Sequence, residues 1–164
     1  MGTYLWLGDD NVLEQLTNMP AGSVKRINAL DQERSAVVHR AEQEDYSASI
    51  DAYETETKKF ERALRAMGDE NAFSLHALIE KGLGKVRAWE YIYQRFGKDD
   101  SACGHTSDPE VMLRLVEAQR DYYGHGIVLG TPEQVAEANR WHNAMVERVL
   151  DFIRAGRITK LWWG

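Results

Sequence analysis

The chain has 164 residues, of which 43% are hydrophobic and 28% charged, and its formal net charge is −6. This composition predicts one soluble domain with a real core, and the negative charge disfavours non-specific binding to nucleic acid or to an anionic membrane. A single cysteine, Cys103, excludes an internal disulfide framework. With no secretion signal and no apolar run of membrane-spanning length in view, we expect a cytoplasmic protein.

The chain begins with a short aromatic run at residues 3–7, which is predicted to be a β-strand ended by Gly8. Asp9 or Asp10 is then expected to cap a brief helix that ends near Pro20. The apolar positions of this helix are Val12, Leu13 and Leu16.

Residues 23–67 contain neither glycine nor proline and are predicted to be helical. Residues of the second half recur at spacings of four and three, the pattern of a packed helix. These are Tyr46, Ile50, Tyr53, Thr57, Phe60, Leu64 and Met67. A similar row in the first half is two residues out of phase, so the two halves present opposite faces. Its members are Ile27, Leu30, Val37 and Ala41.

We expect one very long, kinked helix over about 23–67. At 1.5 Å per residue it would measure about 67 Å, against a radius of gyration of about 15 Å for a compact chain of this length. Such a helix needs a second subunit to cover it, so a homodimer is predicted. The alternative is a break near residues 45–49, with Ser47 or Ser49 capping a second, antiparallel helix.

The next segment, residues 69–96, is predicted to form a helix capped by Asp69 and stopped by Gly97. Its apolar seam keeps its phase across Gly82 and Gly84. This favours one helix with a weak point over two separate helices.

Residues 97–108 are polar and predicted to be a loop. Asp108 precedes Pro109 and should cap a helix that ends at Gly124. Residues 127–129 are a short strand or an extended linker.

Thr131 and Gln134 have the spacing of a capping box, which predicts a last helix running to Gly156. The tail, residues 158–163, is a second aromatic run, and its pairing with residues 3–7 would form a two-stranded cap. The tryptophans of these two runs are expected to pack against their own fold, with a contact patch as the alternative. They are Trp6, Trp162 and Trp163.

These elements together predict an all-α protein, with residues 1–164 as a single helical domain. It would be an elongated helical bundle with one very long helix and a small cap from the two termini.

The motifs of several enzyme classes are missing. The sequence contains no GxxxxGK[ST], HExxH, CxxC or GxSxG motif and no EF-hand loop. We therefore expect no cofactor, no metal and no enzymatic activity.

Scattered polar groups offer weaker signals. His142 lies on an apolar seam, which is more typical of a core histidine than of a catalytic base. His76 and Glu80 have the spacing of a ligand pair on a helix, but a surface hydrogen bond is the simpler interpretation. Asp121 and His125 straddle a helix end, and a carboxylate beside a histidine is a catalytic arrangement. A small enzyme with a site near Asp121, His125 and His142 is therefore one alternative.

Two further readings involve residues 73–97 and the loop that follows. Residues 73–97 resemble a helix-turn-helix in spacing, with Lys85, Arg87 and Arg95 available for DNA, so a DNA-binding regulator is another alternative. The unbroken seam and the shortage of other basic residues count against it. The loop could hold a metal, but one cysteine with one histidine is a poor zinc set. Its candidate ligands are Asp99, Asp100, Cys103, His105 and Asp108.

The remaining feature is an acidic run with no lysine or arginine among its residues. Its six carboxylates are Glu42, Glu44, Asp45, Asp51, Glu54 and Glu56. A solvated outer face is the ordinary explanation. The functional one is a docking surface for a basic site on a partner protein, which could block a nucleic-acid-binding groove. Our first hypothesis is thus a non-enzymatic, protein-binding and inhibitory protein, resembling phage-encoded inhibitors and immunity proteins in general character alone.

Overall fold

The computed structural model describes residues 3–97, 102–124 and 130–164. The predictions that fall on Asp99, Asp100, His125 and residues 127–129 lie outside the described residues. Within them the predicted helical class is confirmed. The elements in chain order are β1 (Leu5–Leu7), α1 (Asp10–Leu16), α2 (Ser23–Glu42), α3 (Tyr46–Gly68), α4 (Glu70–Lys81), α5 (Trp89–Phe96), β2 (Gly104–Thr106), α6 (Pro109–Glu117), η1 (Tyr122–Gly124), α7 (Pro132–Arg154) and β3 (Leu161–Trp163).

Contacts within the chain define two compact units, which are described separately. The hairpin unit is Leu13–Ile79, and the sheet unit combines Met1–Val12 with Glu80–Gly164. The expectation of a single domain stays a prediction. Among the described helices, none has the length and apolar character that crossing a bilayer requires.

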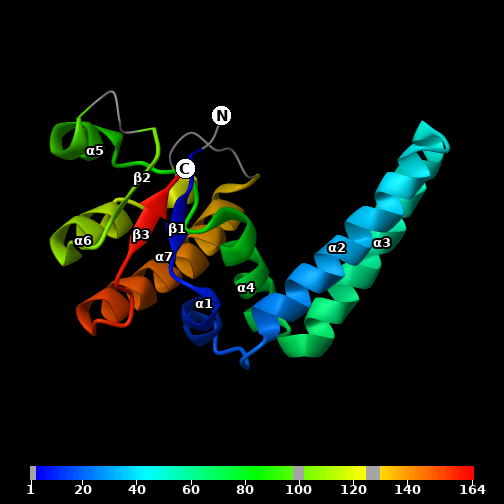
Figure 1. Cartoon of the computed structure of the whole chain (residues 1–164), viewed down its shortest axis with the longest axis horizontal. Coiled ribbons are helices and arrows are strands. Elements are labelled where there is room, and N and C mark those ends of the chain that lie inside the picture. Colours follow the sequence, from blue (N-terminus) through cyan, green and yellow to red (C-terminus); the bar gives the residue numbers. More distant parts are fainter. Residues whose placement is uncertain (1–2, 98–101, 125–129) are drawn as a thin grey trace. The chain divides into compact units, whose positions relative to one another are not determined.

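The hairpin unit is built on α2 and α3, which run antiparallel and pack side by side (Figure 1). The prediction of one long helix over 23–67 is therefore wrong. α2 ends at Glu42, and Asp45 caps α3 by accepting a hydrogen bond from the Ala48 amide at 2.7 Å. The break lies where the alternative placed it, although Asp45 rather than Ser47 or Ser49 is the cap.

The acidic residues at this turn explain the error. Anions at the end of a helix oppose its dipole, so the acidic residues that follow α2 disfavour a break there when α2 is considered alone. Asp45 lies at the start of α3 as well, where the same dipole favours a negative charge and the free amides need an acceptor. One carboxylate thus stabilises the start of the second helix.

The base of the hairpin unit holds its apolar core. Glu14 is buried and accepts a hydrogen bond from the Val24 amide at 3.0 Å, which caps α2 where Gly22 has no side chain to do so. Asp9 caps α1 as predicted, accepting from the Val12 amide at 3.0 Å. Buried apolar residues from α2, α3 and α4 fill the space between these helices: Val24, Ile27, Phe60, Leu64, Ala72, Leu75 and Leu78.

The sheet unit contains three antiparallel strands in the order β1-β3-β2. β3 lies in the centre, and Trp163 pairs with Leu5 on one side and Gly104 on the other. The predicted pairing of the two chain ends is thus confirmed, whereas β2 falls in the segment predicted to be a loop. A Cβ on Gly104 would lie 2.6 Å from the Trp163 ring, so glycine makes room for this buried tryptophan. Trp162 stays 37% exposed.

The helix predicted over 69–96 is two helices, because the chain leaves α4 at Lys81 to run beside β1. The Leu83 amide donates to Leu5 O at 2.9 Å, and the Leu5 amide donates to Gly84 O at 3.0 Å. Gly82 makes the turn possible with a φ of +53°. Backbone pairing with β1 therefore replaces the helix that the apolar spacing predicted.

The predicted starts of α6 and α7 are confirmed. Asp108 accepts a hydrogen bond from the Glu110 amide at 2.9 Å, and the capping box of Thr131 and Gln134 is present. α6 ends at Glu117, earlier than predicted, and η1 occupies the approach to Gly124.

Substitution of Gly82 tests the turn after α4. A Cβ there would lie 2.1 Å from Leu5 O, while one on Gly156, which also has a positive φ, would meet nothing within 4 Å. We expect Gly156→Ala to lower the free energy of unfolding by about 1–2 kcal/mol, the cost of the left-handed backbone. Gly82→Ala should cost about 4 kcal/mol or more, or prevent folding. Urea unfolding measures both, and equal losses would contradict the described turn.

Candidate functional site

The far end of the hairpin, near its turn, exposes three large apolar side chains of α3. Tyr46, Ile50 and Tyr53 are 81%, 45% and 57% exposed. We call these residues the tyrosine stripe. They continue the same helical row that buries Phe60 and Leu64 nearer the base. Sequence spacing thus found the row correctly but could not tell which part of it is covered.

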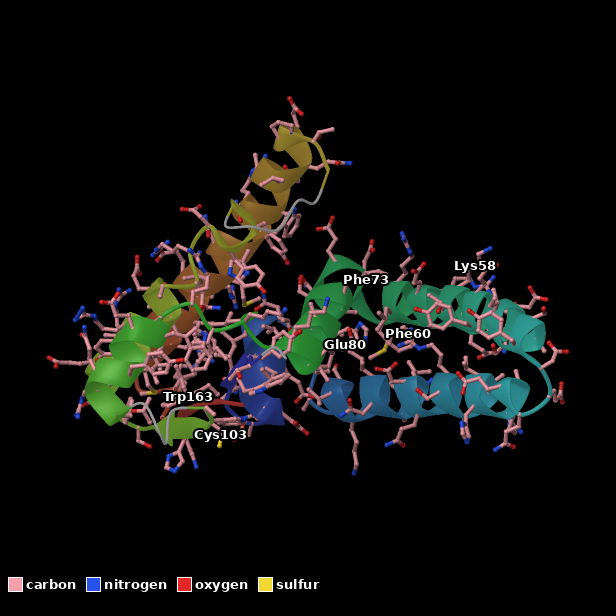
Figure 2. The ribbon with its side chains drawn as sticks, turned by 90° about the horizontal axis from the view of Figure 1, so that it is seen from above. Lys58, Phe60, Phe73, Glu80, Cys103 and Trp163 are labelled. Atoms are coloured by element: carbon pink, nitrogen blue, oxygen red, sulfur yellow. The ribbon has the colours of Figure 1, made fainter. Side chains whose placement is uncertain are left out.

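The row is covered where α4 meets it. The ring of Phe60 packs against His76 of α4 with a centroid distance of 4.7 Å, and the Arg34 guanidinium lies over it at 4.4 Å. In Figure 2, Phe60 lies between α3 and α2, whereas Lys58 points away from α2. Beyond Phe60 toward the turn, the row reaches solvent at Tyr53.

On α3, small residues form the seam with α2 near the turn, where Val37 and Val38 of α2 are half-buried. Ser49 is buried, and Ala41, Ala48 and Ala52 are half-buried. Small side chains let the two helices approach closely, and the larger residues of the tyrosine stripe lie outside this seam. The exposure of the stripe therefore follows from the order of small and large residues along α3.

Three of the six predicted partner-binding carboxylates have contacts within the hairpin. Asp45 is the cap of α3, and the Glu42 carboxylate lies 3.6 Å from His39 Nδ1. Glu56 is half-buried and lies 3.5 Å from Lys59 Nζ.

The other three form a distinct group. Glu44, Asp51 and Glu54 are exposed, and within the described residues none of them forms an ion pair. We call them the hairpin carboxylates. Glu54 directly follows Tyr53 and lies about 80° round the helix from the tyrosine stripe, on its flank, whereas Asp51 lies about 130° from the stripe, toward the opposite side of α3. The structure thus places an exposed apolar row near exposed carboxylates; that a partner binds there stays a prediction.

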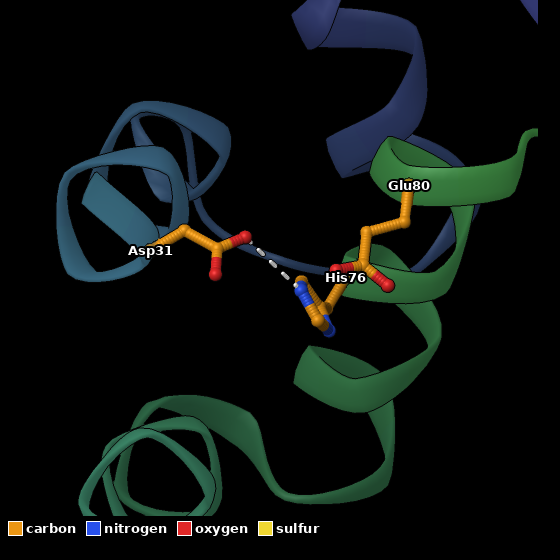
Figure 3. Close-up of side chains that lie close together, drawn as sticks. All are labelled: Asp31, His76 and Glu80. Atoms are coloured by element: carbon orange, nitrogen blue, oxygen red, sulfur yellow. Dashed lines mark hydrogen bonds and ion pairs between the residues drawn. The ribbon is translucent and has the colours of Figure 1, made fainter. Parts of the chain in front are cut away.

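A polar cluster closes the base of the hairpin. His76 Nε2 lies 3.3 Å from Asp31 Oδ2, and Asp31 also pairs with Arg34. Figure 3 shows Asp31 and His76 facing each other, with Glu80 one turn further along α4. Because the Arg34 guanidinium already neutralises Asp31, it would compete with a metal cation for that carboxylate. We interpret the cluster as a structural link between α2 and α4.

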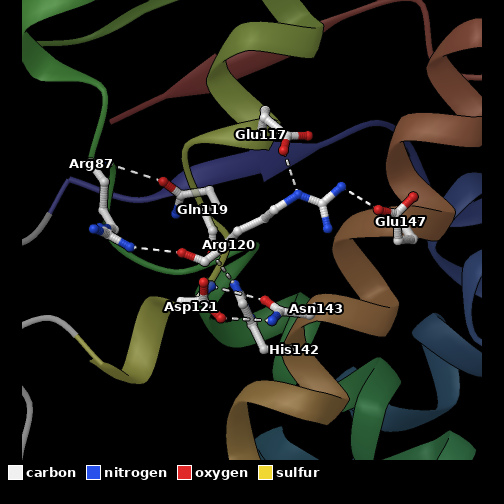
Figure 4. Close-up of polar contacts among 8 residues, drawn as sticks. All are labelled: Arg87, Glu117, Gln119, Arg120, Asp121, His142, Asn143 and Glu147. Carbon is white, nitrogen blue, oxygen red and sulfur yellow. Dashed lines mark hydrogen bonds and ion pairs between the residues drawn. The ribbon is translucent and has the colours of Figure 1, made fainter.

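Sequence reasoning missed Gln119, which organises the polar interior of the sheet unit (Figure 4). This residue is fully buried. Its amide nitrogen donates to Leu83 O at 2.9 Å and Lys85 O at 3.0 Å, and its oxygen accepts from the Arg87 amide at 3.1 Å. It thereby pairs the backbone of a segment that lies outside any regular element. No spacing or motif in the sequence marks a glutamine for this role.

Arg87 is held inside the sheet unit. Its guanidinium donates to Arg120 O at 2.9 Å, and the segment before α5 runs beside β1 rather than forming the tight turn of a helix-turn-helix. This geometry gives the DNA-binding alternative no support.

His142 is also engaged structurally. Its Nε2 lies 2.7 Å from Gln119 O, and the rings of Tyr122 and Tyr123 pack within 5.8 Å of it. Asp121, which the sequence pairs with His125, accepts a hydrogen bond from Asn143 Nδ2 at 2.9 Å (Figure 4). Burial and the nearby charge of Arg87 lower the pKa of His142, so the neutral ring is favoured and its Nε2–H donates to Gln119.

Comparison of the chain with protein-family models, with curated proteins and with solved structures finds no match.

The half-buried His142 predicts a pH dependence of stability. Because folding lowers its pKa, its stabilising contribution is fully present above the ordinary value of 6.5 and is lost as the pH falls below it. We expect the urea midpoint to fall between about pH 8 and about pH 5, and His142→Gln to reduce this fall. The control His105→Gln changes an exposed histidine of β2 and should leave the fall unchanged. An equal fall in both variants would contradict the assignment.

Proposed function

We propose that the protein is a non-enzymatic binding protein that docks a basic site on another protein through the far end of its hairpin. The observation that carries this proposal is the exposed tyrosine stripe at the acidic end of the hairpin, with Glu54 on its flank and Glu44 and Asp51 exposed nearby. Exposed apolar groups of this size, gathered in one row and rimmed by charge, are typical of interaction sites.

The two rows would contribute differently to binding. Exposed ion pairs add only about 0.2–1 kcal/mol each, so the carboxylates would act mainly on the association rate and on the choice of a basic partner. Tyrosine side chains supply a large apolar area with little loss of conformational entropy, and tyrosines are over-represented at binding hot spots. The tyrosine stripe would therefore supply most of the affinity.

Occupying a basic site has a functional consequence. A basic groove that holds carboxylates from this hairpin cannot hold an anionic ligand at the same time, so the bound protein acts as an inhibitor of nucleic-acid or phosphate binding by its partner. A cytoplasmic location belongs to this proposal and is supported by an exposed free thiol, Cys103, which a reducing compartment preserves.

The argument that led to the predicted homodimer does not apply to this structure. It rested on a continuous helix too long for its globule, and the chain instead folds back as a hairpin. The tyrosine stripe is the surface that a second molecule would cover, and in this proposal the partner protein covers it.

Charge reversal on the hairpin tests the proposal. We expect Asp51→Lys with Glu54→Lys to reduce capture of the partner from source-cell lysate about ten-fold, because attraction to a basic site becomes repulsion. Glu33→Lys with Glu61→Lys is the matched control, since it changes the same charge at exposed positions of α2 and α3. Quantitative mass spectrometry should find a basic protein retained by wild type and control alone. Identical retention by all three proteins would contradict the proposal.

A further inference from the structure

The hairpin unit packs three helices at its base and two near its turn. At the base, α4 lies against the row on α3 through the contact of His76 with Phe60, and the Asp31–His76 pair ties α4 to α2. Closer to the turn, the same row continues as the tyrosine stripe without a cover. The position that α4 fills at the base is open at the other end.

The dimensions of the open position suit a helix. From Tyr46 to Tyr53 the stripe is about 10 Å long, at 1.5 Å per residue, and its spacings of four and three are those by which one helix packs on another. Backbone groups of α2 and α3 are paired within their own helices, so this surface offers no strand edge to which an extended peptide could add. An occupant must bind here through side chains.

The charges on α3 favour a helix of another protein over a second copy of this chain as the occupant of the tyrosine stripe. In an antiparallel pair of identical helices, each flank meets the same flank of its mate, so the acidic flank that carries Glu54 would face the acidic flank of the second copy. Like charges in that arrangement oppose association. A helix with lysine or arginine beside its apolar row would face the same flank favourably.

We propose that the occupant of the tyrosine stripe is one amphipathic α-helix of the partner, with apolar residues at spacings of four and three and basic residues on the flank nearest Glu54. This inference rests on the proposed function and specifies the element of the partner that the hairpin recognises. The helix continues along α3 the packing that α4 provides at the base.

Two synthetic peptides of identical composition test this inference. Both are about 18 residues of leucine, alanine and lysine, which is about 27 Å of helix. One has leucines on a single face with lysines beside them, and the other has the same residues in an order without helical periodicity. Fluorescence anisotropy titration against the full chain measures both affinities.

We expect the amphipathic peptide to bind about ten-fold more tightly than its scrambled isomer. Tyr46→Ala with Tyr53→Ala should abolish this preference, whereas Tyr93→Ala, an exposed tyrosine of α5, should retain it. Because both stripe tyrosines are exposed, circular dichroism should show an unchanged fold in the variant. Asp51→Lys with Glu54→Lys should weaken both peptides.

The contrary results separate the two proposals. Equal binding of both peptides, still weakened by Asp51→Lys with Glu54→Lys, would overturn the helix and leave the basic docking site standing. If neither peptide binds, both the helix proposal and the proposal of docking to a basic site are overturned. A doubled mass in sedimentation that Tyr53→Ala returns to a monomer would assign the stripe to a second copy and overturn the helix proposal.

Discussion

The reversal of the chain between Glu42 and Tyr46 is the constraint on which the hairpin unit depends. It converts a long stretch without helix breakers into two helices that cover each other. No glycine or proline makes this turn. A cap does so instead, because the Asp45 carboxylate satisfies an amide at the start of α3 and lies at the favourable end of its dipole. The same turn places the acidic run and the tyrosine stripe together.

The base and the far end of the hairpin therefore have different energetics. At the base, large apolar residues from three helices are buried together, and Arg34, Asp31 and His76 close the packing with charged contacts. Near the turn, alanine and serine form the seam and contribute less apolar burial. A helix pair of this kind gains stability when another apolar surface covers it, which links the fold of the hairpin to its proposed binding role.

Much of the fold could be predicted because its boundaries are local. The capping box at Thr131, the cap at Asp108 and the pairing of the aromatic ends all follow from residues a few positions apart or from β-prone runs. The end of α4 could not, since it depends on hydrogen bonds between Leu83 and Leu5, far apart in the sequence. The break at Asp45 is not predicted from the dipole of α2 alone, because the same carboxylate is favourable at the start of the next helix.

The candidate site was predictable in part. The sequence identified the acidic run and the apolar row, but not that Asp45, Glu42 and Glu56 serve the hairpin itself or that Tyr46 and Tyr53 lack a cover. Whether these side chains are buried depends on where α2, α3 and α4 begin and end, and the sequence predicts those helix boundaries wrongly. Gln119 carried no signal at all, because its three backbone partners come from a segment whose path only the folded chain reveals.

The central claim is that residues 23–68 fold back as a hairpin. The distance between the ends of α2 and α3 that lie away from the turn tests it most directly. Spin labels at Arg26→Cys and Arg62→Cys, in a Cys103→Ser background, allow that distance to be measured by double electron–electron resonance. Packed helices have axes about 8–10 Å apart, so the hairpin predicts a narrow distribution at about 20 Å between the labels. A distribution centred at about 54 Å, the span of a continuous helix between these residues, would contradict the hairpin and the docking surface built on it.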